Sequence, residues 1–178
     1  MRELRALEPN AIYHVTTRGA RQQPIFRDAL DFERYLSLLG DAMRRFDCKC
    51  FAYCLMPNHV HLILREPRMR LPEAMQRLNL RYAIRFNARY DYKGHAFDRR
   101  YWSDIVESDS HLLEAFRYVA NNPVRAGLVE SAAEWRWSSY SAVVAMTMQA
   151  PLLAADTLDL FGSLSRFREF VESPDPSS

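Results

Sequence analysis

The chain of 178 residues contains no run of 18 or more apolar residues. Its first nine residues also lack the apolar stretch and the small-residue cleavage pattern of a secretory signal. We therefore expect no membrane span and no membrane partner, and we interpret the chain as a cytoplasmic protein. Repeats are absent, and hydrophobic residues make up 48% of the chain, which predicts one globular domain with a modest extension.

Cysteine is scarce, and its number is odd. The three residues Cys48, Cys50 and Cys54 argue against a disulfide framework. Their even spacing would place all three on one face of a strand, where they could form a zinc site. The alternative, which we favour, is that they are small buried strand residues, because cysteine is among the most buried residue types.

Net charge is also small, at +2, but it is unevenly distributed. The segment 65–100 has ten Lys or Arg against four acids, so it carries +6 and the rest of the chain −4. Arginine recurs at every fourth position of one predicted helix, at Arg77, Arg81, Arg85 and Arg89. Such a run is normally a solvated face. None of the four is followed by an acid four residues later, so a surface that binds a polyanion remains an equal alternative.

The hydrophobic pattern predicts six elements in the order strand, helix, strand, strand, helix, strand. They span residues 11–18, 28–46, 48–56, 59–65, 72–90 and 97–106. A third helix begins at Ser108 or Asp109 and is closed by Pro123. This order is the split βαβ arrangement of a ferredoxin-like or RRM-like α+β fold. We expect an antiparallel sheet with two helices on one face and the third helix across the other.

Two histidines in the third predicted strand form the most informative pair. His59 and His61 point to one face of that strand, whereas Val60, Leu62 and Leu64 point to the other. The apolar set can face the core, so both imidazoles stand together at a spacing that suits one cation. A pair of polar histidines without a metal is the alternative.

The third predicted helix carries a tyrosine and an asparagine four residues apart. Tyr118 lies beside the buried stripe of this helix, and Asn122 projects from the same side one turn later. The plainer interpretation is a boundary tyrosine followed by an asparagine that ends the helix before proline.

Together these stretches resemble a known family. The segment 53–64, Tyr-Cys-Leu-Met-Pro-Asn-His-Val-His-Leu-Ile-Leu, resembles the HUH motif of the single-tyrosine transposases, which include the REP-associated tyrosine transposases and the IS200-like domain. The segment 118–129, Tyr-Val-Ala-Asn-Asn-Pro-Val-Arg-Ala-Gly-Leu-Val, resembles that family's tyrosine helix. Further matches are at 13–19, at 137–140 and between 160 and 171, so the resemblance covers nearly the whole chain. We expect an HUH domain at 1–129 and a C-terminal aromatic and helical extension at 130–178, in which the sequence pattern predicts one or two short helices at 156–171.

The resemblance also implies a mechanism and a substrate. Tyr118 would attack a DNA phosphodiester and form a 5′-phosphotyrosine, while His59, His61 and Asn122 hold a divalent ion. Asn121 competes for the ligand role, but helix geometry favours Asn122. Imidazoles suit zinc or manganese, and oxygen ligands suit hard cations; the resemblance points to Mg²⁺ or Mn²⁺. The implied substrate is hairpin-forming single-stranded DNA of the bacterial nucleoid, and a monomer is favoured over a dimer that exchanges the tyrosine helix.

We predict the DNA contacts from charge and aromatic residues. Arginines beside an aromatic ring can follow and stack a single strand. The predicted contact residues are Arg18, Arg77, Arg81, Arg85, Arg99, Arg100, Trp102 and Arg125.

Two other functions fit parts of the pattern. A non-catalytic RRM-like module that binds nucleic acid would have the fold but would need neither Tyr118 nor the histidine pair. An unrelated metal hydrolase could use the two histidines, but the sequence offers it no third strong ligand in an obvious motif.

Overall fold

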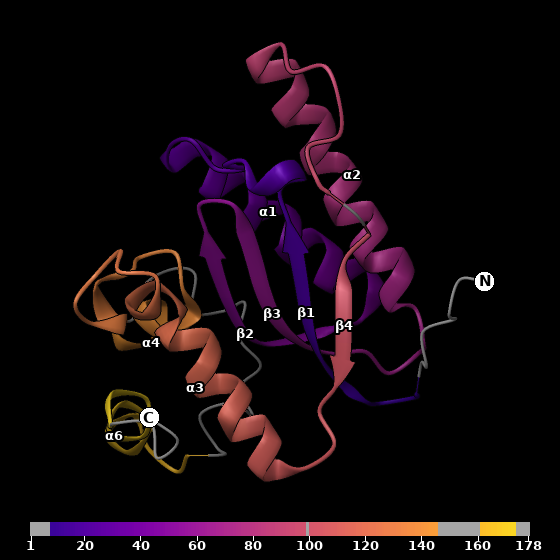
Figure 1. Ribbon diagram of the computed structural model, residues 1–178. Helices are drawn as coiled ribbons and strands as arrows, with labels where there is room; N and C mark the ends of the chain where they lie inside the picture. Colours follow the sequence, from indigo (N-terminus) through magenta and orange to yellow (C-terminus); the bar gives the residue numbers. More distant parts are fainter. Residues whose placement is uncertain (1–7, 99, 146–160, 174–178) are drawn as a thin grey trace.

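The computed structural model describes residues 8–98, 100–145 and 161–173. Its centre is a four-stranded sheet in the order β2-β3-β1-β4, in which every neighbouring pair is antiparallel (Figure 1). The strands are β1 (Ile12–Arg18), β2 (Lys49–Met56), β3 (His59–Arg65) and β4 (Trp102–Ile105). This topology confirms the predicted ferredoxin-like α+β fold.

Two long helices cover one face of the sheet. They are α1 (Ala29–Phe46) and α2 (Leu71–Tyr90), as Figure 1 shows. Asp28 begins α1, because its side chain accepts a hydrogen bond from the backbone N–H of Asp31. The helices bury their apolar stripes against Val60, Leu62 and Leu64 of β3 in one core.

The opposite face of the sheet is covered by α3 (Asp109–Arg125) and the C-terminal segments. Phe116 and Val119 of α3 pack with Ile63 of β3 in a second core. The segments that complete this side are η2 (Ala132–Glu134), α4 (Ser139–Val144) and α6 (Leu164–Glu172). Adjacent residues of β3 therefore pack in different cores. The polar residues on the second face of the sheet lie where α3 crosses that face.

A bulge in β2 overturns the prediction for the cysteines. The pairing register between β2 and β3 shifts between Cys50 and Ala52. The extra residue reverses the alternation of side chains between the two faces of the sheet. Cys50 therefore lies in the first core and Cys54 in the second. All three cysteines are buried free thiols, as the favoured interpretation held.

Two predicted boundaries were also wrong. Pro123 does not close α3, which continues to Arg125. Gly127 caps the end of the helix: it has a φ of 67°, its N–H donates to the Val124 carbonyl, and the Leu128 N–H donates to the Pro123 carbonyl. Among the described residues of the predicted strand at 97–106, only 102–105 form a regular strand, and one isolated bridge joins Gly19 and Phe97.

The segment after α3 packs against the edge strand β2. The carbonyl of Trp137 accepts a hydrogen bond from the Leu55 N–H, and the Ser139 hydroxyl accepts one from the Tyr53 N–H. The division into domains at residue 129 stays a prediction. Helix α6 confirms one of the helices expected near the C-terminus, while residues 156–160 of that prediction lie outside the described ranges. No helix of the described chain is long and apolar enough to cross a bilayer.

Candidate active site

The structure brings His59, His61 and Tyr118 together on the second face of the sheet. Strand β3 places the two imidazoles on one side, with their ring centroids 4.9 Å apart. The ring of Tyr118, from α3, meets His61 edge-on at a centroid distance of 5.4 Å. Residues 57 positions apart in the sequence thus meet because α3 crosses the strand that carries the histidines.

Tyr118 is the accessible member of this group. Its side chain is 38% exposed, whereas neighbouring Val119 is buried in the second core. The Arg125 guanidinium lies 5.2 Å from the centre of the Tyr118 ring, so one face of the ring is beside a cation. The tyrosine is therefore open to a substrate on a rigid helix, next to a charge that suits a phosphate.

The two asparagines have different surroundings. The Asn122 side chain is buried, and its Oδ1 lies 3.4 Å from Nε2 of His59. The Asn121 amide points away and donates to the carbonyls of Arg117 and Val171. Asn122 is thus the one placed beside the histidines.

Burial keeps the imidazoles neutral. Desolvation lowers the pKa of His59, and it lowers that of His61 to about 2, aided by the neighbouring imidazoles of His59 and His14 and by Arg18. The pKa of His14 is also lowered, mainly by burial. Neutral imidazoles are the form that binds metals, so protons do not compete for these nitrogens near pH 7.

The donor set can be tested for its fit to a divalent ion. Within residues 8–98, 100–145 and 161–173, no three His, Cys, Asp or Glu side chains are placed to share a metal. A site here needs the Asn122 oxygen as its third ligand. Oδ1 of Asn122 lies 3.4 Å from Nε2 of His59. An imidazole nitrogen and an amide oxygen can both ligate a divalent ion, so the residues fit the implied ion.

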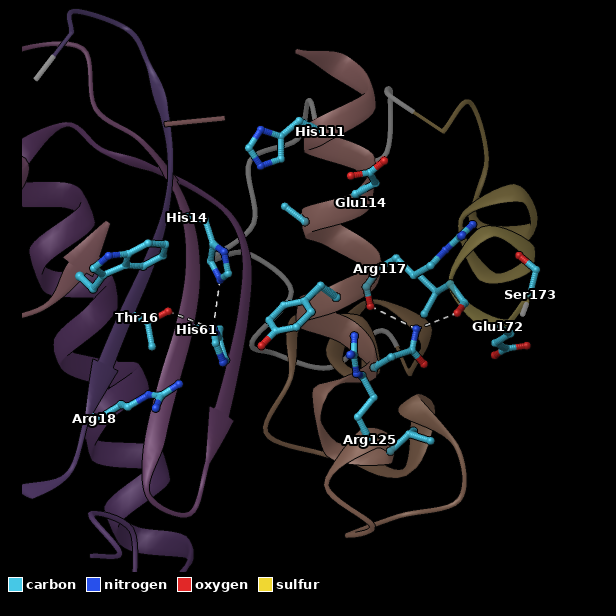
Figure 2. Close-up of a pocket in the computed structure, with 16 residues that line it drawn as sticks. His14, Thr16, Arg18, His61, His111, Glu114, Arg117, Arg125, Glu172 and Ser173 are labelled. Carbon is cyan, nitrogen blue, oxygen red and sulfur yellow. Dashed lines mark hydrogen bonds between the residues drawn. The ribbon is translucent and has the colours of Figure 1, made fainter. Parts of the chain in front are cut away.

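A cleft of about 1210 Å³ runs between the sheet and α3. Figure 2 shows His14, Thr16, Arg18 and His61 on its sheet side, facing Arg125 on the helix side. Tyr118 also lines the cleft. The walls of the cleft thus combine a potential nucleophile, imidazoles and arginines. This composition suits the binding of a phosphodiester.

Comparison with known proteins identifies the family. The sequence pattern described as "Transposase IS200 like" matches residues 8–122. The chain belongs to this family. A protein of Haemophilus influenzae named for the REP-associated tyrosine transposases is 30% identical over 105 residues, which cover 50% of this chain and 57% of that protein. The match spans less than two thirds of that relative.

A solved structure of a REP-associated tyrosine transposase shows the same fold. It covers 82% of this chain and 86% of its own, with a TM-score of 0.69 and 16% sequence identity. That protein is bound to a REP hairpin.

The predicted DNA contacts of this member of the IS200-like family lie on separate parts of the surface. Arg18, Trp102 and Arg125 line the cleft. Helix α2, which carries Arg77, Arg81 and Arg85, packs on the opposite face of the sheet. Arg81 contacts Asp41 at 3.3 Å. Arg100 is exposed, and Arg99 lies outside the described residues.

Three residues of the site were not predicted. Nε2 of His14 lies 3.0 Å from Nδ1 of His61, and the Thr16 hydroxyl lies 3.2 Å from the same nitrogen. His111 lines the cleft at the start of α3. For His111 a signal existed, because seven residues are almost two full helical turns and return the chain to the face of Tyr118.

Proposed function

We propose that this transposase cuts and rejoins single-stranded DNA through a covalent bond to Tyr118. The observation that carries the proposal is the meeting of the exposed Tyr118 with the buried His61 in one cleft, next to the half-buried His59 of the same strand. A structural tyrosine would not need an open side chain beside imidazoles. A nucleophile needs both access and a rigid position.

The proposed cleavage exchanges one phosphodiester bond for another, so the energy of the broken DNA bond is kept in the bond to tyrosine. The phenol oxygen of Tyr118 attacks the phosphorus, and the bond from phosphorus to the 3′ oxygen breaks. The phenolic proton is lost and the departing oxygen gains one, so the products are a 5′-phosphotyrosine and a free 3′-OH. A second 3′-OH can displace the tyrosine and reseal the strand without ATP, which suits strand transfer.

His59, His61 and Asn122 would hold the divalent ion, which we propose to be Mg²⁺ or Mn²⁺. When bound, such an ion supplies Lewis-acid stabilisation of the charge on the phosphate. The protein positions the reacting groups: β3 fixes the imidazoles, and α3 fixes Tyr118 and Asn122 one helical turn apart. Arg125 is placed to hold a phosphate oxygen beside the Tyr118 ring.

We propose that the substrate is a hairpin with a single-stranded flank, in the cytoplasm of a bacterium. Two observations support this: a relative of the same fold is bound to a REP hairpin, and Trp102 and Arg18 line the cleft. An aromatic ring beside cations can stack a base and hold the backbone of a single strand. We propose a monomer, in which Asn121 and Arg117 of α3 donate hydrogen bonds to the carbonyls of Val171 and Phe170 in α6.

A denaturing gel tests the proposal. The protein is mixed with end-labelled hairpin DNA and Mn²⁺ or Mg²⁺, and the covalent adduct is measured. We expect Tyr118→Phe to lower adduct formation by more than about 10³-fold, because the attacking oxygen is gone. His59→Ala and His61→Ala should reduce it strongly. Tyr92→Phe, which changes a tyrosine outside the cleft, is the control and should react normally.

Two outcomes would overturn the proposal. Efficient cutting by Tyr118→Phe would exclude this tyrosine as the nucleophile. Tight binding of the hairpin by the unchanged protein, with no adduct in either metal, would favour a non-catalytic module that only binds nucleic acid.

A further inference from the structure

The side chain of Asn58 bridges a neighbouring loop and a histidine of the site. This residue lies in the turn between β2 and β3, directly before His59. Its amide nitrogen donates a hydrogen bond to the carbonyl of Gln22 at 3.1 Å, and its Oδ1 lies 2.7 Å from Nδ1 of His59.

The first contact determines the direction of the second. A backbone carbonyl can only accept a hydrogen bond, so the NH₂ group of Asn58 must face Gln22 and its oxygen must face His59. That oxygen can in turn only accept, so the ring proton of a neutral His59 belongs on Nδ1. Nε2 is then left with its lone pair directed at the site.

A second acceptor competes for the same proton. Oδ1 of Asn122 lies 3.4 Å from Nε2 of His59, on the other side of the ring. If the proton moved to Nε2, His59 would donate to Asn122, and two of the three prospective ligands would bind each other instead of a cation. The Asn58 contact is shorter by 0.7 Å and therefore the stronger hydrogen bond, which favours the proton on Nδ1.

We propose that Asn58 is a positioning residue that holds the ring proton of His59 on Nδ1, so that Nε2 and the Asn122 oxygen both present lone pairs to a divalent ion. The bound ion in this inference rests on the proposed function, whereas the hydrogen bonds of Asn58 do not depend on it. Partners on the far nitrogen of a ligating histidine commonly fix the ring in this way.

The loop that supplies the Gln22 carbonyl is built for close contact. Arg21 and Gln22 both have left-handed backbone angles, with φ of 54° and 61°. A Cβ at Gly19 would lie 2.2 Å from the Gln23 carbonyl oxygen, so only glycine fits there. Strained backbone of this kind is typical beside functional sites, and here it brings a carbonyl to the Asn58 amide.

Backbone bonds hold the turn independently of the Asn58 side chain. The Gly19 N–H donates to the Asn58 carbonyl at 2.8 Å, and the Ile25 N–H donates to the Pro57 carbonyl at 2.8 Å. We therefore expect Asn58→Ala to fold with the turn intact. His61 serves as an internal reference, because its Nδ1 contacts His14 and Thr16 and not Asn58.

The test is the position of the ring proton in the metal-free protein. Long-range ¹H–¹⁵N correlation spectra of the imidazoles distinguish an Nδ1–H from an Nε2–H tautomer. We expect Nδ1–H for His59 in the unchanged protein and Nε2–H in Asn58→Ala, with the His61 signals the same in both. Asn58→Asp keeps an acceptor for Nδ1–H and should retain the original tautomer.

Mn²⁺ binding links the tautomer to the cation. With free Mn²⁺ counted by electron paramagnetic resonance, we expect the affinity of Asn58→Ala to fall roughly 10- to 100-fold and that of Asn58→Asp to recover most of the loss. A proton on Nε2 in the unchanged protein, an unaltered tautomer in Asn58→Ala, or equal Mn²⁺ affinity in all three proteins would overturn the inference. Failure of the proposed function would appear separately, as no DNA adduct from a protein with the expected His59 tautomer.

Discussion

His61 is a titratable group that folding removes from water. Its side chain is only 3% exposed, and it packs between His59, His14 and Tyr118. Burial is the main reason that its pKa falls to about 2. In the unfolded chain the same imidazole titrates near its ordinary value of about 6.5. At a pH between these two pKa values, His61 binds a proton in the unfolded state but not in the folded state.

We therefore expect the free energy of unfolding to decrease as the pH falls from about 6.5 towards 4. The contribution of His61 is about 1.4 kcal/mol per pH unit in this window, because the unfolded state gains one more proton. Urea denaturation at several pH values in EDTA measures it. His61→Asn should flatten the dependence, whereas His95→Asn, at an exposed position, should not. An equal slope in His61→Asn and the unchanged protein would contradict the expectation.

Local spacing revealed the residues whose partners are near in sequence or belong to a motif. The pair His59 and His61 follows from strand alternation, and Asn122 from one turn of helix after Tyr118. His14 could not be found in this way, because a lone histidine in a strand has no periodic partner. Its place depends on the register that pairs Thr16 with His61 across β1 and β3, which is a long-range property.

At the scale of elements, Asp31 ties the first turn of α1 to the last turn of α2. This buried carboxylate accepts hydrogen bonds from the Arg89 guanidinium at 2.6 Å, the Tyr90 hydroxyl at 2.7 Å and the Arg27 backbone N–H at 2.9 Å. Its removal would leave three donors without this acceptor in a half-buried position.

We expect Asp31→Ala to lower the free energy of unfolding by about 3 kcal/mol. Asp41→Ala is the matched control, because Asp41 pairs with Arg44 and Arg81 on the exposed side of the same two helices. That substitution should cost less than about 1 kcal/mol. Chemical denaturation at pH 7 compares them, and similar losses in both variants would argue against a special role for Asp31.

The elements themselves were predicted well where the hydrophobic period is long. Helices α1 and α2 and the hairpin of β2 and β3 occur within a few residues of their expected bounds. The bulge at Cys50 was missed because nothing in a run of apolar residues shows where one side chain is added. Pro123 was misjudged because its ring is tolerated where the cap at Gly127 and the packing of α3 maintain the helix.

At the scale of the whole molecule, positive charge occupies two separated surfaces. Arg18 and Arg125 line the cleft, whereas Arg77 and Arg85 belong to α2 on the other side of the sheet. A hairpin that enters the cleft reaches α2 only if it extends around the domain. The salt dependence of binding reports how many phosphates the protein contacts.

We expect Arg85→Ala to reduce the slope of log affinity against log salt by about 0.7 to 0.9, the value for one lost phosphate contact. Arg81→Ala should have a smaller effect, because this arginine already contacts Asp41. Arg45→Ala, an exposed change on α1, is the control. Binding titrations of a labelled hairpin at several salt concentrations give the slopes; an unchanged slope in Arg85→Ala would remove α2 from the DNA interface.

The residues of the two cores leave the ribosome at different times. Apart from Trp137, the first core uses residues between 13 and 101, while in the second core residues from 112–143 and 161–171 cover β2 and β3. A chain leaves the ribosome from its N-terminus, so the sheet and its α1 and α2 layer can form while α3 is still being made. We expect the histidines to be placed early and the tyrosine late. An unfinished chain would thus present an uncovered apolar sheet face to chaperones, and it would lack Tyr118, the residue that we propose breaks the DNA strand.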